Sequence, residues 1–505
     1  MLKPIDDFLN NYTMYKVVLY GLLALVALCF LLSVAGILFY NPVQLLNSLG
    51  ILVAACFASN YIFSKLLKAP TNVESYLITA LILFFVFVPA VTINDYITLA
   101  AASTIAMASK YIFAINNKHI FNPAAISAFI MGLMGNGNAS WWVGADFLLP
   151  FVLIIGLLIV RKIRRFRLFI SFLIASTLTI ALFQAGNGIP LLTAIPEAYV
   201  SWPIIFFGTI MLTEPLTTPP TKRLQLIYGV LVGFLFGSQF QIGPIFSSPE
   251  FALVVGNIYS YIVSPKAKLF LKFKERIPAA ANTFEYVFTS NHKLQYKPGQ
   301  YLEWTLPHTR PDSRGNRRYF TIASSPTEDE LRLGVRLEEK SSSFKNKLKE
   351  LSPNDILVAS QLTGDFTLPE DTSKKLVFIA GGIGITPFRS MIKYMLDKGE
   401  KRSVVLFYAN KTADEIAYRD FFDQAQHVFG LTPVYVLTDK EHVPAGWLGR
   451  VGRIDEAMLK DVVPDFKERI FYISGPNAMV DAYKRLLAKL GVPHTNIVTD
   501  YFPGF

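Results

Sequence analysis

Charged residues and cysteines are scarce in the first half of this 505-residue sequence. Only 13 of the 48 Lys/Arg residues and 8 of the 37 Asp/Glu residues precede residue 265. The net charge of +11 is spread over both halves, so we expect no nucleic-acid partner, which would need a concentrated basic surface. Cys29 and Cys56 both lie in apolar runs, and two thiols cannot ligate a four-cysteine iron–sulfur cluster.

Histidine is also rare, because only His119 of the six histidines lies before residue 265. Two stacked haems need axial ligands from both sides, so we expect neither a haem relay in the first half nor a metal site. A cleavable signal peptide is not expected either, since the first apolar run is too long and lacks a small-residue cleavage site.

Long apolar runs dominate the first half. A helix needs about 20 apolar residues to cross the hydrocarbon of a bilayer, and several runs approach that length. We therefore expect a polytopic α-helical membrane domain of about ten helices over residues 1–264. The runs are 16–40, 47–64, 76–93, 97–115, 120–135, 145–160, 168–185, 199–213, 224–240 and 250–264.

The basic residues of this half predict its orientation. Ten crossings place the basic segments "RKIRRFR" (161–167) and "TKR" (221–223) on one side, whereas the opposite-side loops 186–198 and 241–249 contain no Lys or Arg. Because basic loops stay on the cytoplasmic side, we expect a multi-pass protein of the inner (plasma) membrane. Its N-terminus and everything after Pro265 would be cytoplasmic.

A first interruption of the apolar pattern is "KHIFNPAAISAF" (118–129). Asn122 followed by Pro123 is typical of a helix start, since asparagine caps free N–H groups and proline needs no N–H bond there. The free N–H groups of such a helix start also suit a phosphate or another anion. A capped loop without a ligand fits the same residues.

A second interruption is "MLTEPLTTPPTKR" (211–223). It places Glu214 between two apolar runs, where a carboxylate is costly without a partner. Lys222 or Arg223 is the partner we expect. Here too a simple capped loop fits the residues.

These two interruptions, with "GLLIVRKIRRF" between them, resemble the membrane subunits B and D of the sodium-pumping NADH:quinone reductase and of the Rnf complex (the NqrB/RnfD family). The resemblance covers about residues 1–264 and implies a flavin or quinone site. It marks as candidates His119, Asn122, Pro123, Glu214, Thr217 and Thr218.

Many members of that family carry FMN esterified to a threonine in an "SGAT"-type motif. The corresponding region here, "GNGNASWWVGADF", has Ser140 as its one hydroxyl and no such motif. The resemblance thus leaves two readings open: noncovalent FMN or riboflavin in the membrane domain, or a membrane domain that has lost its cofactor.

The second half has the mixed composition of a soluble protein. Alternating runs such as "NTFEYVFTS" and "LRLGVRLE" predict antiparallel strands, and strand–loop–helix units follow after about Lys374. We expect an antiparallel β-barrel FAD domain over 265–372 and an α/β NAD(P)H-binding domain over 373–505.

The segment "VFIAGGIGITP" joins an apolar strand to a helix through glycines. Gly381, Gly382 and Gly384 permit a tight turn and a close approach to a pyrophosphate. A glycine turn alone is also common in strand–helix units that bind nothing.

Several motifs in order resemble the ferredoxin–NADP(+) reductase family: "YKPGQYLEW", "RYFT", "KSSSFKNKL", "GDF", "GGIGITP" and "SGPNAM". The resemblance implies that Arg318 binds the FAD pyrophosphate, Phe320 lies against the flavin ring and Thr321 bonds near N5. The further binding residues that it implies are Tyr319, Ser342, Ser343, Thr386, Pro387, Gly475 and Pro476.

The same resemblance marks residues close to the hydride path. Ser474 stands where many members have cysteine, and the C-terminal "DYFPGF" implies a terminal aromatic that covers the flavin ring. Phe502 is the first choice for that aromatic and Phe505 the second. We expect Thr321, Ser474 and Phe502 to act in hydride transfer.

Together these patterns predict a membrane-bound, FAD-dependent NAD(P)H oxidoreductase. Electrons would pass from cytoplasmic NAD(P)H through FAD to a membrane flavin or quinone, with a quinone or a flavinylated protein outside the membrane as final acceptor. Redox-driven Na+ or H+ translocation and a purely anchoring membrane half are the alternatives. "YANKTADE" does not distinguish NADH from NADPH.

Overall fold

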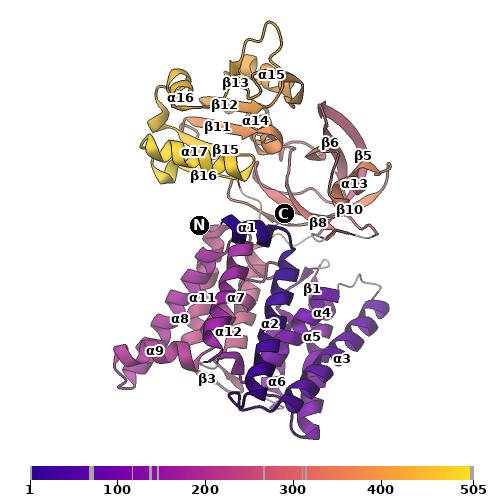
Figure 1. Ribbon diagram of the computed structural model, residues 1–505, viewed down its shortest axis with the longest axis vertical. Helices are drawn as coiled ribbons and strands as arrows, with labels where there is room; N and C mark the ends of the chain where they lie inside the picture. The colour runs from indigo at the N-terminus through magenta and orange to yellow at the C-terminus, as the bar shows by residue number, and fades with distance from the viewer. Residues whose placement is uncertain are drawn as a thin grey trace. The chain divides into compact units, whose positions relative to one another are not determined.

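The computed structural model describes residues 3–67, 73–115, 118–135, 139–144, 147–264, 268–309, 311–312 and 315–500. The chain divides into two compact units, with the boundary between Lys268 and Leu269. Unit 1 precedes this boundary and consists mainly of helices. Unit 2 follows it and contains two six-stranded sheets with their helices (Figure 1).

Unit 1 contains most of the helices that the apolar runs predict. They are α1 (Lys3–Asn10), α2 (Met14–Val34), α3 (Pro42–Leu66), α4 (Val73–Val86), α5 (Ile93–Ile112), α6 (Pro123–Leu133), α7 (Leu149–Ile163), α8 (Phe166–Gly186), α9 (Leu191–Ser201), α10 (Ile204–Phe206), α11 (Lys222–Gly237) and α12 (Pro249–Val263). Shorter elements are η1 (Trp142–Gly144), the π-helical turn η2 (Phe207–Met211) and the hairpins β1 (Ala114–Ile115)–β2 (Lys118–His119) and β3 (Gln241–Ile242)–β4 (Ile245–Phe246).

Three helices of the described residues are long and apolar enough to cross a membrane: α2, α3 and α8. Leu191–Ser201 and Ile204–Met211 pass the same test only as a pair bent by 65°, which gives up to four. The expectation of about ten spans is therefore wrong by this measure. The reason is that apolar runs continue past helix ends: α4 ends at Val86, inside the run 76–93, and α6 has only 11 residues.

Apolar side chains on the outside of unit 1 suit a lipid environment. Large exposed hydrophobic residues recur along its helices, and Leu31 of α2, Leu182 of α8 and Leu192 of α9 are 68%, 65% and 90% exposed. Contiguous exposed apolar surface of this kind is rare on proteins that are surrounded by water. The exposed apolar residues and the three long apolar helices are the features of unit 1 that suggest membrane insertion.

Small residues let α8 and α11 pack closely. Gly229, Gly233 and Gly237 recur every four residues on α11, and a Cβ added to any of them would lie within 2.8 Å of a side-chain atom of α8. Small residues at this spacing are typical of helix pairs in membranes, where contact between backbones replaces the hydrophobic effect.

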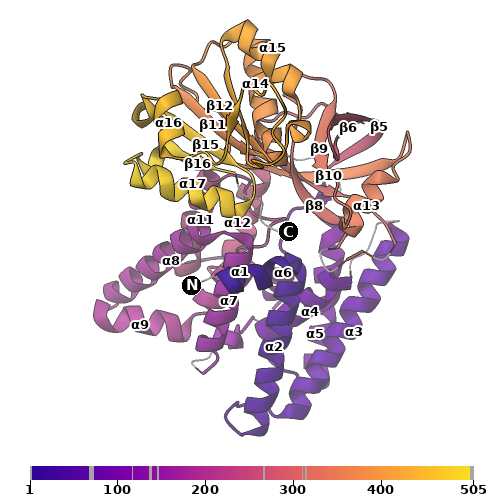
Figure 2. The ribbon, with the colours of Figure 1, turned by 45° about the horizontal axis from the view of Figure 1, so that its top comes forward.

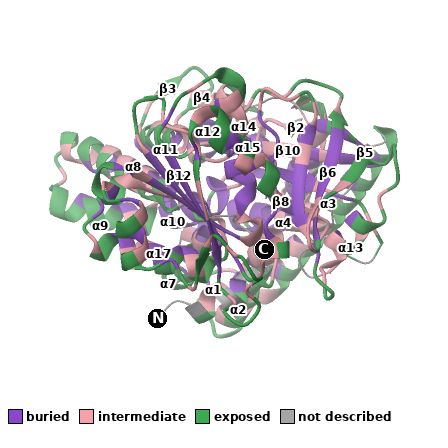
Figure 3. Cartoon of the chain, turned by 90° about the horizontal axis from the view of Figure 1, so that it is seen from above, coloured by how far each residue is buried: buried purple, intermediate pink, exposed green. Residues whose placement is uncertain are grey.

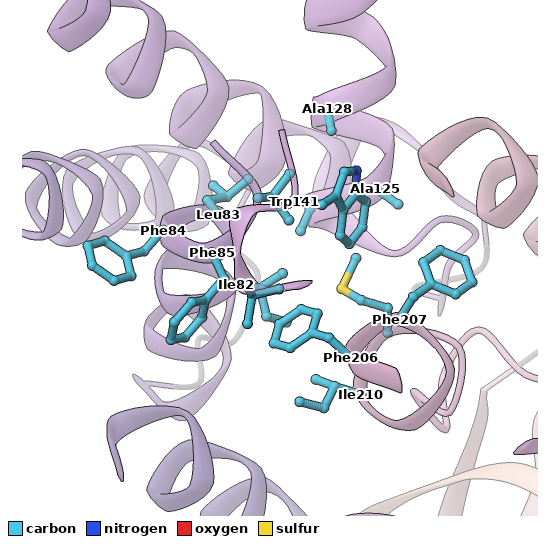
Figure 4. Close-up of a cluster of buried hydrophobic side chains, with 14 of the residues drawn as sticks. Ile82, Leu83, Phe84, Phe85, Ala125, Ala128, Trp141, Phe206, Phe207 and Ile210 are labelled. Atoms are coloured by element: carbon cyan, nitrogen blue, oxygen red, sulfur yellow. The ribbon is translucent and has the colours of Figure 1, made fainter. Parts of the chain in front are cut away.

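The core of unit 1 is rich in aromatic side chains (Figure 4). The ring of Phe85 on α4 lies 5.7 Å from that of Phe206, and Trp141 lies 5.8 Å from Phe207. The indole of Trp142 donates to the carbonyl oxygen of Phe84 at 2.7 Å. These contacts join α4 and the Trp141–Trp142 segment to each other and to the irregular segment that follows α9.

The first sheet of unit 2 is antiparallel, as the alternating runs predict. Its order is β8-β7-β10-β5-β6-β9. Its members are β5 (Leu269–Ala280), β6 (Thr283–Ser290), β7 (Tyr301–Thr305), β8 (Arg317–Thr321), β9 (Leu331–Arg336) and β10 (Ile356–Thr363), with α13 (Ser343–Lys349) between β9 and β10. Trp304, Phe288 and Phe344 lie in the core that the sheet encloses.

The second sheet is parallel and confirms the expected α/β domain. Its order is β14-β13-β12-β11-β15-β16. The strands are β11 (Leu376–Gly381), β12 (Val404–Asn410), β13 (Thr432–Leu437), β14 (Arg450–Val451), β15 (Ile470–Ser474) and β16 (Ile497–Thr499). The helical elements are η3 (Gly382–Ile385), α14 (Thr386–Lys398), η4 (Ala413–Glu415), α15 (Arg419–Phe429), α16 (Glu456–Val462), η5 (Phe466–Glu468), α17 (Asn477–Lys489) and η6 (His494–Asn496).

Helices cover both faces of this parallel sheet (Figure 2). Phe378 of β11 packs with α14 and α15, whereas its neighbours Val377 and Ile379 pack with α16 and α17. Successive residues of a strand point to opposite faces, so a strand covered on both sides is apolar throughout. All residues of β11 and β12 are buried, and the region labelled β12 is purple in Figure 3.

Candidate functional site

The candidate nucleotide site lies where the strand order of the parallel sheet reverses. From β11 the chain adds β12, β13 and β14 on one side, and β15 and β16 on the other. Ligands of open α/β sheets bind beyond the carboxyl ends of the strands at such a switch point. Gly381, Gly382 and Gly384 follow β11 there, and Gly475 and Pro476 follow β15.

These two loops approach each other too closely for side chains. A Cβ on Gly384 would lie 2.5 Å from the carbonyl oxygen of Ser474, and one on Gly381 would lie 2.4 Å from Sδ of Met479. Gly382 has a φ of +53°, in the left-handed region that glycine adopts without strain. The glycines are therefore required by the packing of the two loops as well as by any approach to a nucleotide.

Thr386 and Pro387 begin α14 directly after the glycine turn, and both are buried. A Cβ on Gly334 of β9 would lie 2.6 Å from Cγ2 of Thr386 and 2.8 Å from the hydroxyl of Tyr418. Burial raises the pKa of Tyr418 well above its ordinary value, so the phenol is neutral at working pH. Strand β9 of the first sheet thus lies directly against the start of α14.

Ser474 ends β15 with its side chain buried against a carboxylate. Its hydroxyl donates to Oδ2 of Asp500 at 3.1 Å, and both residues are at most 5% exposed. Asp500 directly precedes the C-terminal aromatic segment. The predicted cover residues Phe502 and Phe505 lie outside the described residues, so their role stays a prediction.

The "RYFT" motif forms strand β8, and its side chains alternate between two sides. Tyr319 donates its hydroxyl to Oε2 of Glu303 at 2.9 Å. Phe320 packs 5.7 Å from the ring of Phe344 in the barrel core. Thr321 is buried, and its hydroxyl has no hydrogen-bond partner among the described residues. Such an orphaned hydroxyl fits the expected bond to the flavin ring.

Arg318 is buried and converges with Ser343 on a carboxylate that the motifs did not reveal. Its Nη2 donates to Asp312 at 2.9 and 3.2 Å, and the backbone N–H of Ser343 donates to the same carboxylate at 3.1 Å. Ser342 caps α13 by accepting from the N–H of Lys345. Arg318 and the N–H of Ser343 thus donate to the same carboxylate, and an arrangement of donors around an anion suits the diphosphate of FAD.

Polar contacts tie the flavin-side strands to the nucleotide-side helix. The hydroxyl of Ser390 on α14 donates to the carbonyl oxygen of Ser324 at 2.6 Å, and Arg389 Nη2 donates to Glu328 at 3.0 Å. Ser324 lies three residues after Thr321 in the chain. The candidate flavin residues and the candidate nucleotide residues are thus held in one unit.

In unit 1 the structure brings the two interrupted segments together around a partly open cavity. His119, Asn122, Pro123 and Glu214 line this cavity. Thr217 and Thr218 do not line it, but both hydroxyls donate to Glu214, at 3.2 Å to its side chain and 3.0 Å to its backbone.

Glu214 has partners that the sequence does not predict. The amide of Asn122 donates to its Oε2 at 2.9 Å, and Nε2 of His119 lies 3.7 Å from its Oε1. The contacts that the structure shows are thus with Asn122 and His119, and the expected ion pair with Lys222 or Arg223 stays a prediction. Because α6 begins beside Glu214, its capping residue gives the carboxylate a neutral donor.

Two further residues of this region were missed. Asn257 on α12 is fully buried, accepts from the N–H of Asn122 at 2.8 Å and contacts the hydroxyl of Tyr228 at 3.0 Å. Lys110 on α5 lines the cavity. Each is a lone polar residue inside an apolar run. The sequence shows this feature but does not show that either residue lies near the site.

Residues 378–485 match the family described as "Oxidoreductase NAD-binding domain". A flavohemoprotein of Halalkalibacterium halodurans is 28% identical over 45% of this chain and 58% of its own length. The reductase component of propane 2-monooxygenase from Rhodococcus jostii is 27% identical over 41% of this chain and 56% of its own. The chain thus spans little more than half the length of these curated relatives.

Solved structures match a similar share of this chain. A ferredoxin NADP+ reductase from Neisseria gonorrhoeae with bound FAD and NADP is 19% identical, covers 46% of this chain and 98% of its own, and has a TM-score of 0.40. The family match shows that residues 378–485 are similar to the NAD-binding domain of oxidoreductases, and the curated relatives are similar to the same half of the chain. The resemblance of residues 1–264 to the NqrB/RnfD family stays a prediction.

Proposed function

We propose that this chain is a membrane-bound NAD(P)H dehydrogenase that passes electrons from NAD(P)H, through FAD in unit 2, to a flavin or a quinone in the cavity of unit 1. The observation that supports the proposal most strongly is the cavity itself. An anchor needs apolar helices alone, whereas this cavity brings a carboxylate, an imidazole and an amide together inside an apolar bundle.

The residues of unit 2 have separate roles in this proposal. Arg318 and the N–H of Ser343 hold the diphosphate, and the hydroxyl of Thr321 bonds to the flavin ring. The glycines after β11 admit the dinucleotide, and Ser474, fixed by Asp500, lies at the nicotinamide side. Bound FAD supplies the conversion of a two-electron hydride into single electrons.

The apolar exterior of unit 1 supports membrane insertion. The basic segment 161–167 and the basic residues 221–223 support the orientation, with the N-terminus and the reductase unit in the cytoplasm. The location we propose is the inner (plasma) membrane. The final acceptor is a membrane quinone or a flavinylated protein beyond it.

The full-length protein tests this proposal. Purified in detergent, it should contain two flavins per chain, or one flavin and a quinone-reductase activity; acid precipitation shows whether any flavin stays attached. One flavin, released as FAD, together with no reduction of quinone, would refute the relay and leave the anchoring role. Parallel kinetics with NADH and NADPH identify the electron donor.

Ion translocation is the second candidate, and the buried Glu250 favours it. This carboxylate accepts from the indole of Trp141 at 3.0 Å and lies near the start of α12, the helix that carries Asn257. A buried carboxylate in a membrane bundle is a candidate ion ligand. Vesicles with reconstituted protein should show Na+- or H+-uptake on addition of NAD(P)H if this candidate holds.

A further inference from the structure

Lys110 is the one Lys or Arg side chain among the described residues that line the cavity of unit 1. It comes from the last turn of α5 and is half-buried. The rest of the lining is mostly apolar, with side chains from α2, α4, α7 and η2, such as Val18, Ile78, Ile159 and Ile210. Apolar walls with a few placed polar groups are typical of sites for flat organic ligands.

The ammonium of Lys110 is held by neutral oxygens. It donates to the backbone oxygen of Ser75 at 3.2 Å, to the hydroxyl of Ser75 at 3.0 Å and to the hydroxyl of Thr79 at 3.1 Å. Among the described residues no carboxylate lies within 4.0 Å of it. Its positive charge therefore lacks a direct counter-charge in an apolar setting, where an unpaired charge is costly.

The carboxylate of the same cavity is already engaged elsewhere. Glu214 accepts from Asn122 and Thr217, at 2.9 and 3.2 Å. His119 Nε2 is buried and has no hydrogen-bond partner among the described residues. Among the described residues the cavity thus offers a ligand one cation with no carboxylate within 4.0 Å and one imidazole nitrogen that makes no hydrogen bond, although it lies 3.7 Å from Glu214.

We propose that Lys110 binds a carbonyl oxygen of the conjugated ring that occupies this cavity and stabilises the negative charge which that oxygen gains on reduction. The inference rests on the proposed function, because the ring is the electron acceptor of unit 1. Two of the three acceptors of the ammonium belong to Ser75, so one can be exchanged for a ligand oxygen while α4 still holds the side chain.

A quinone and an isoalloxazine share this chemistry, since both carry ring carbonyl oxygens that become more basic on reduction. With a quinone the balance is complete: NAD(P)H and one proton from water convert the quinone into the quinol and NAD(P)+. Two electrons and one proton come from NAD(P)H. Lys110 contributes charge and orientation and is neither oxidised nor consumed.

The test compares three substitutions of Lys110 in the full-length protein. Lys110→Gln keeps donors for Ser75 and Thr79 and removes the charge, Lys110→Met removes both, and Lys110→Arg keeps the charge. Lys65→Met is the matched control, because Lys65 is an exposed lysine in the last turn of α3. The probe is ubiquinone-1, and ferricyanide reports the reductase unit by itself.

A charge-assisted hydrogen bond contributes enough that its loss weakens binding about tenfold. Lys110→Gln and Lys110→Met should therefore raise the KM for ubiquinone-1 roughly tenfold, while Lys110→Arg and Lys65→Met stay within about twofold of the wild type. If a flavin is the occupant, the two neutral variants should instead lose the second flavin on purification, and the other two should retain it.

The outcomes separate this inference from the proposed function. A Lys110→Gln protein with wild-type flavin content and wild-type KM for ubiquinone-1 overturns the role of Lys110 alone. A wild-type protein with one flavin and no quinone reduction overturns the relay and this inference together. Melting temperatures of all variants are measured in parallel, because equal losses of stability in Lys110→Arg and Lys110→Gln would show that Lys110 acts in packing only.

Discussion

The side-chain amide of Asn122 donates to Oε2 of Glu214 at 2.9 Å and joins two segments that lie 92 positions apart in the sequence. Asn122 also accepts from the N–H groups of Ala124 and Ala125 and so caps α6. One side chain therefore begins a helix and holds a carboxylate at the cavity. This relationship turns two separate interruptions of the apolar pattern into one polar site.

Substitution of Glu214 tests the site in unit 1. Glu214→Ala should leave the reduction of ferricyanide by NAD(P)H intact, because that reaction needs unit 2 alone, and should reduce electron delivery to the membrane acceptor at least tenfold. Glu197→Ala is the control, since Glu197 is an exposed carboxylate of the same unit. Equal loss of both activities would point to a folding role for Glu214.

Arg318 should control retention of FAD. Removal of a buried, charge-assisted hydrogen bond costs about 1.5–3 kcal/mol, which corresponds to a loss of affinity of tenfold or more. Arg318→Ala should therefore lose FAD on dilution, as measured by flavin fluorescence. The neighbouring Arg317→Ala is the control, because its side chain is 36% exposed and contacts Glu303. Equal retention of FAD in both variants would contradict the assignment.

A methyl group at Gly384 should separate the two loops of the nucleotide site. Its Cβ would lie 2.5 Å from the Ser474 carbonyl oxygen, and backbone cannot move aside as a flexible side chain can. Gly384→Ala should destabilise unit 2 by about 1–3 kcal/mol and raise the KM for NAD(P)H. Gly399→Ala has backbone strain at φ +64° without a clash, so its KM should stay unchanged.

The stability of unit 2 should depend on pH through the carboxyl group of Asp465. A hydrogen bond from Arg469 and a further bond from Lys375 lower the pKa of this carboxyl to about 2. A carboxyl with a lowered folded-state pKa stabilises the fold above its unfolded pKa of about 3.9, and this contribution disappears as the pH falls towards 2. Asp465→Asn should lower stability at pH 7 by no more than about 1 kcal/mol, because water screens the pair.

The melting temperature of unit 2, followed by the release of FAD on heating, measures the contribution of Asp465 to stability. The difference in melting temperature between Asp465→Asn and the wild type should be constant from pH 7 to about 5 and should close as the pH falls from about 4 to 2. Asp461→Asn removes a carboxylate whose ion pair with Arg450 is mostly exposed, and it serves as the control. A difference that persists unchanged at the lowest pH would show that the ion pair is not its cause.

The motifs that the sequence predicts well are those whose geometry is local. "RYFT" is one strand, "GGIGITP" is one turn, and Asn122-Pro123 is one helix start, so propensity and spacing suffice to place them. The alternation of apolar residues likewise predicts the antiparallel sheet, and the strand–loop–helix units predict the parallel one. Each of these features is decided within a few neighbouring residues.

The features that the sequence did not predict depend on contacts between distant segments. Asp312 reaches Arg318 through a loop without a motif, and Lys110 faces the cavity only because α5 packs beside α4. The number of spans was overestimated because hydropathy does not mark where a helix ends. The run 199–213 shows this, since the chain bends by 65° at the break before Ile204.

The central claim is that electrons from NAD(P)H leave unit 2 and enter unit 1. The most direct measurement mixes the wild-type protein, reconstituted in vesicles that contain quinone, with NAD(P)H in the absence of oxygen. Optical spectra then follow the oxidation of NAD(P)H, the flavins and the quinone. The account predicts one quinol per NAD(P)H oxidised, or reduction of a second flavin after the first. Oxidation of NAD(P)H that stops when a single flavin per chain is reduced, with neither quinol nor a second reduced flavin, would contradict it.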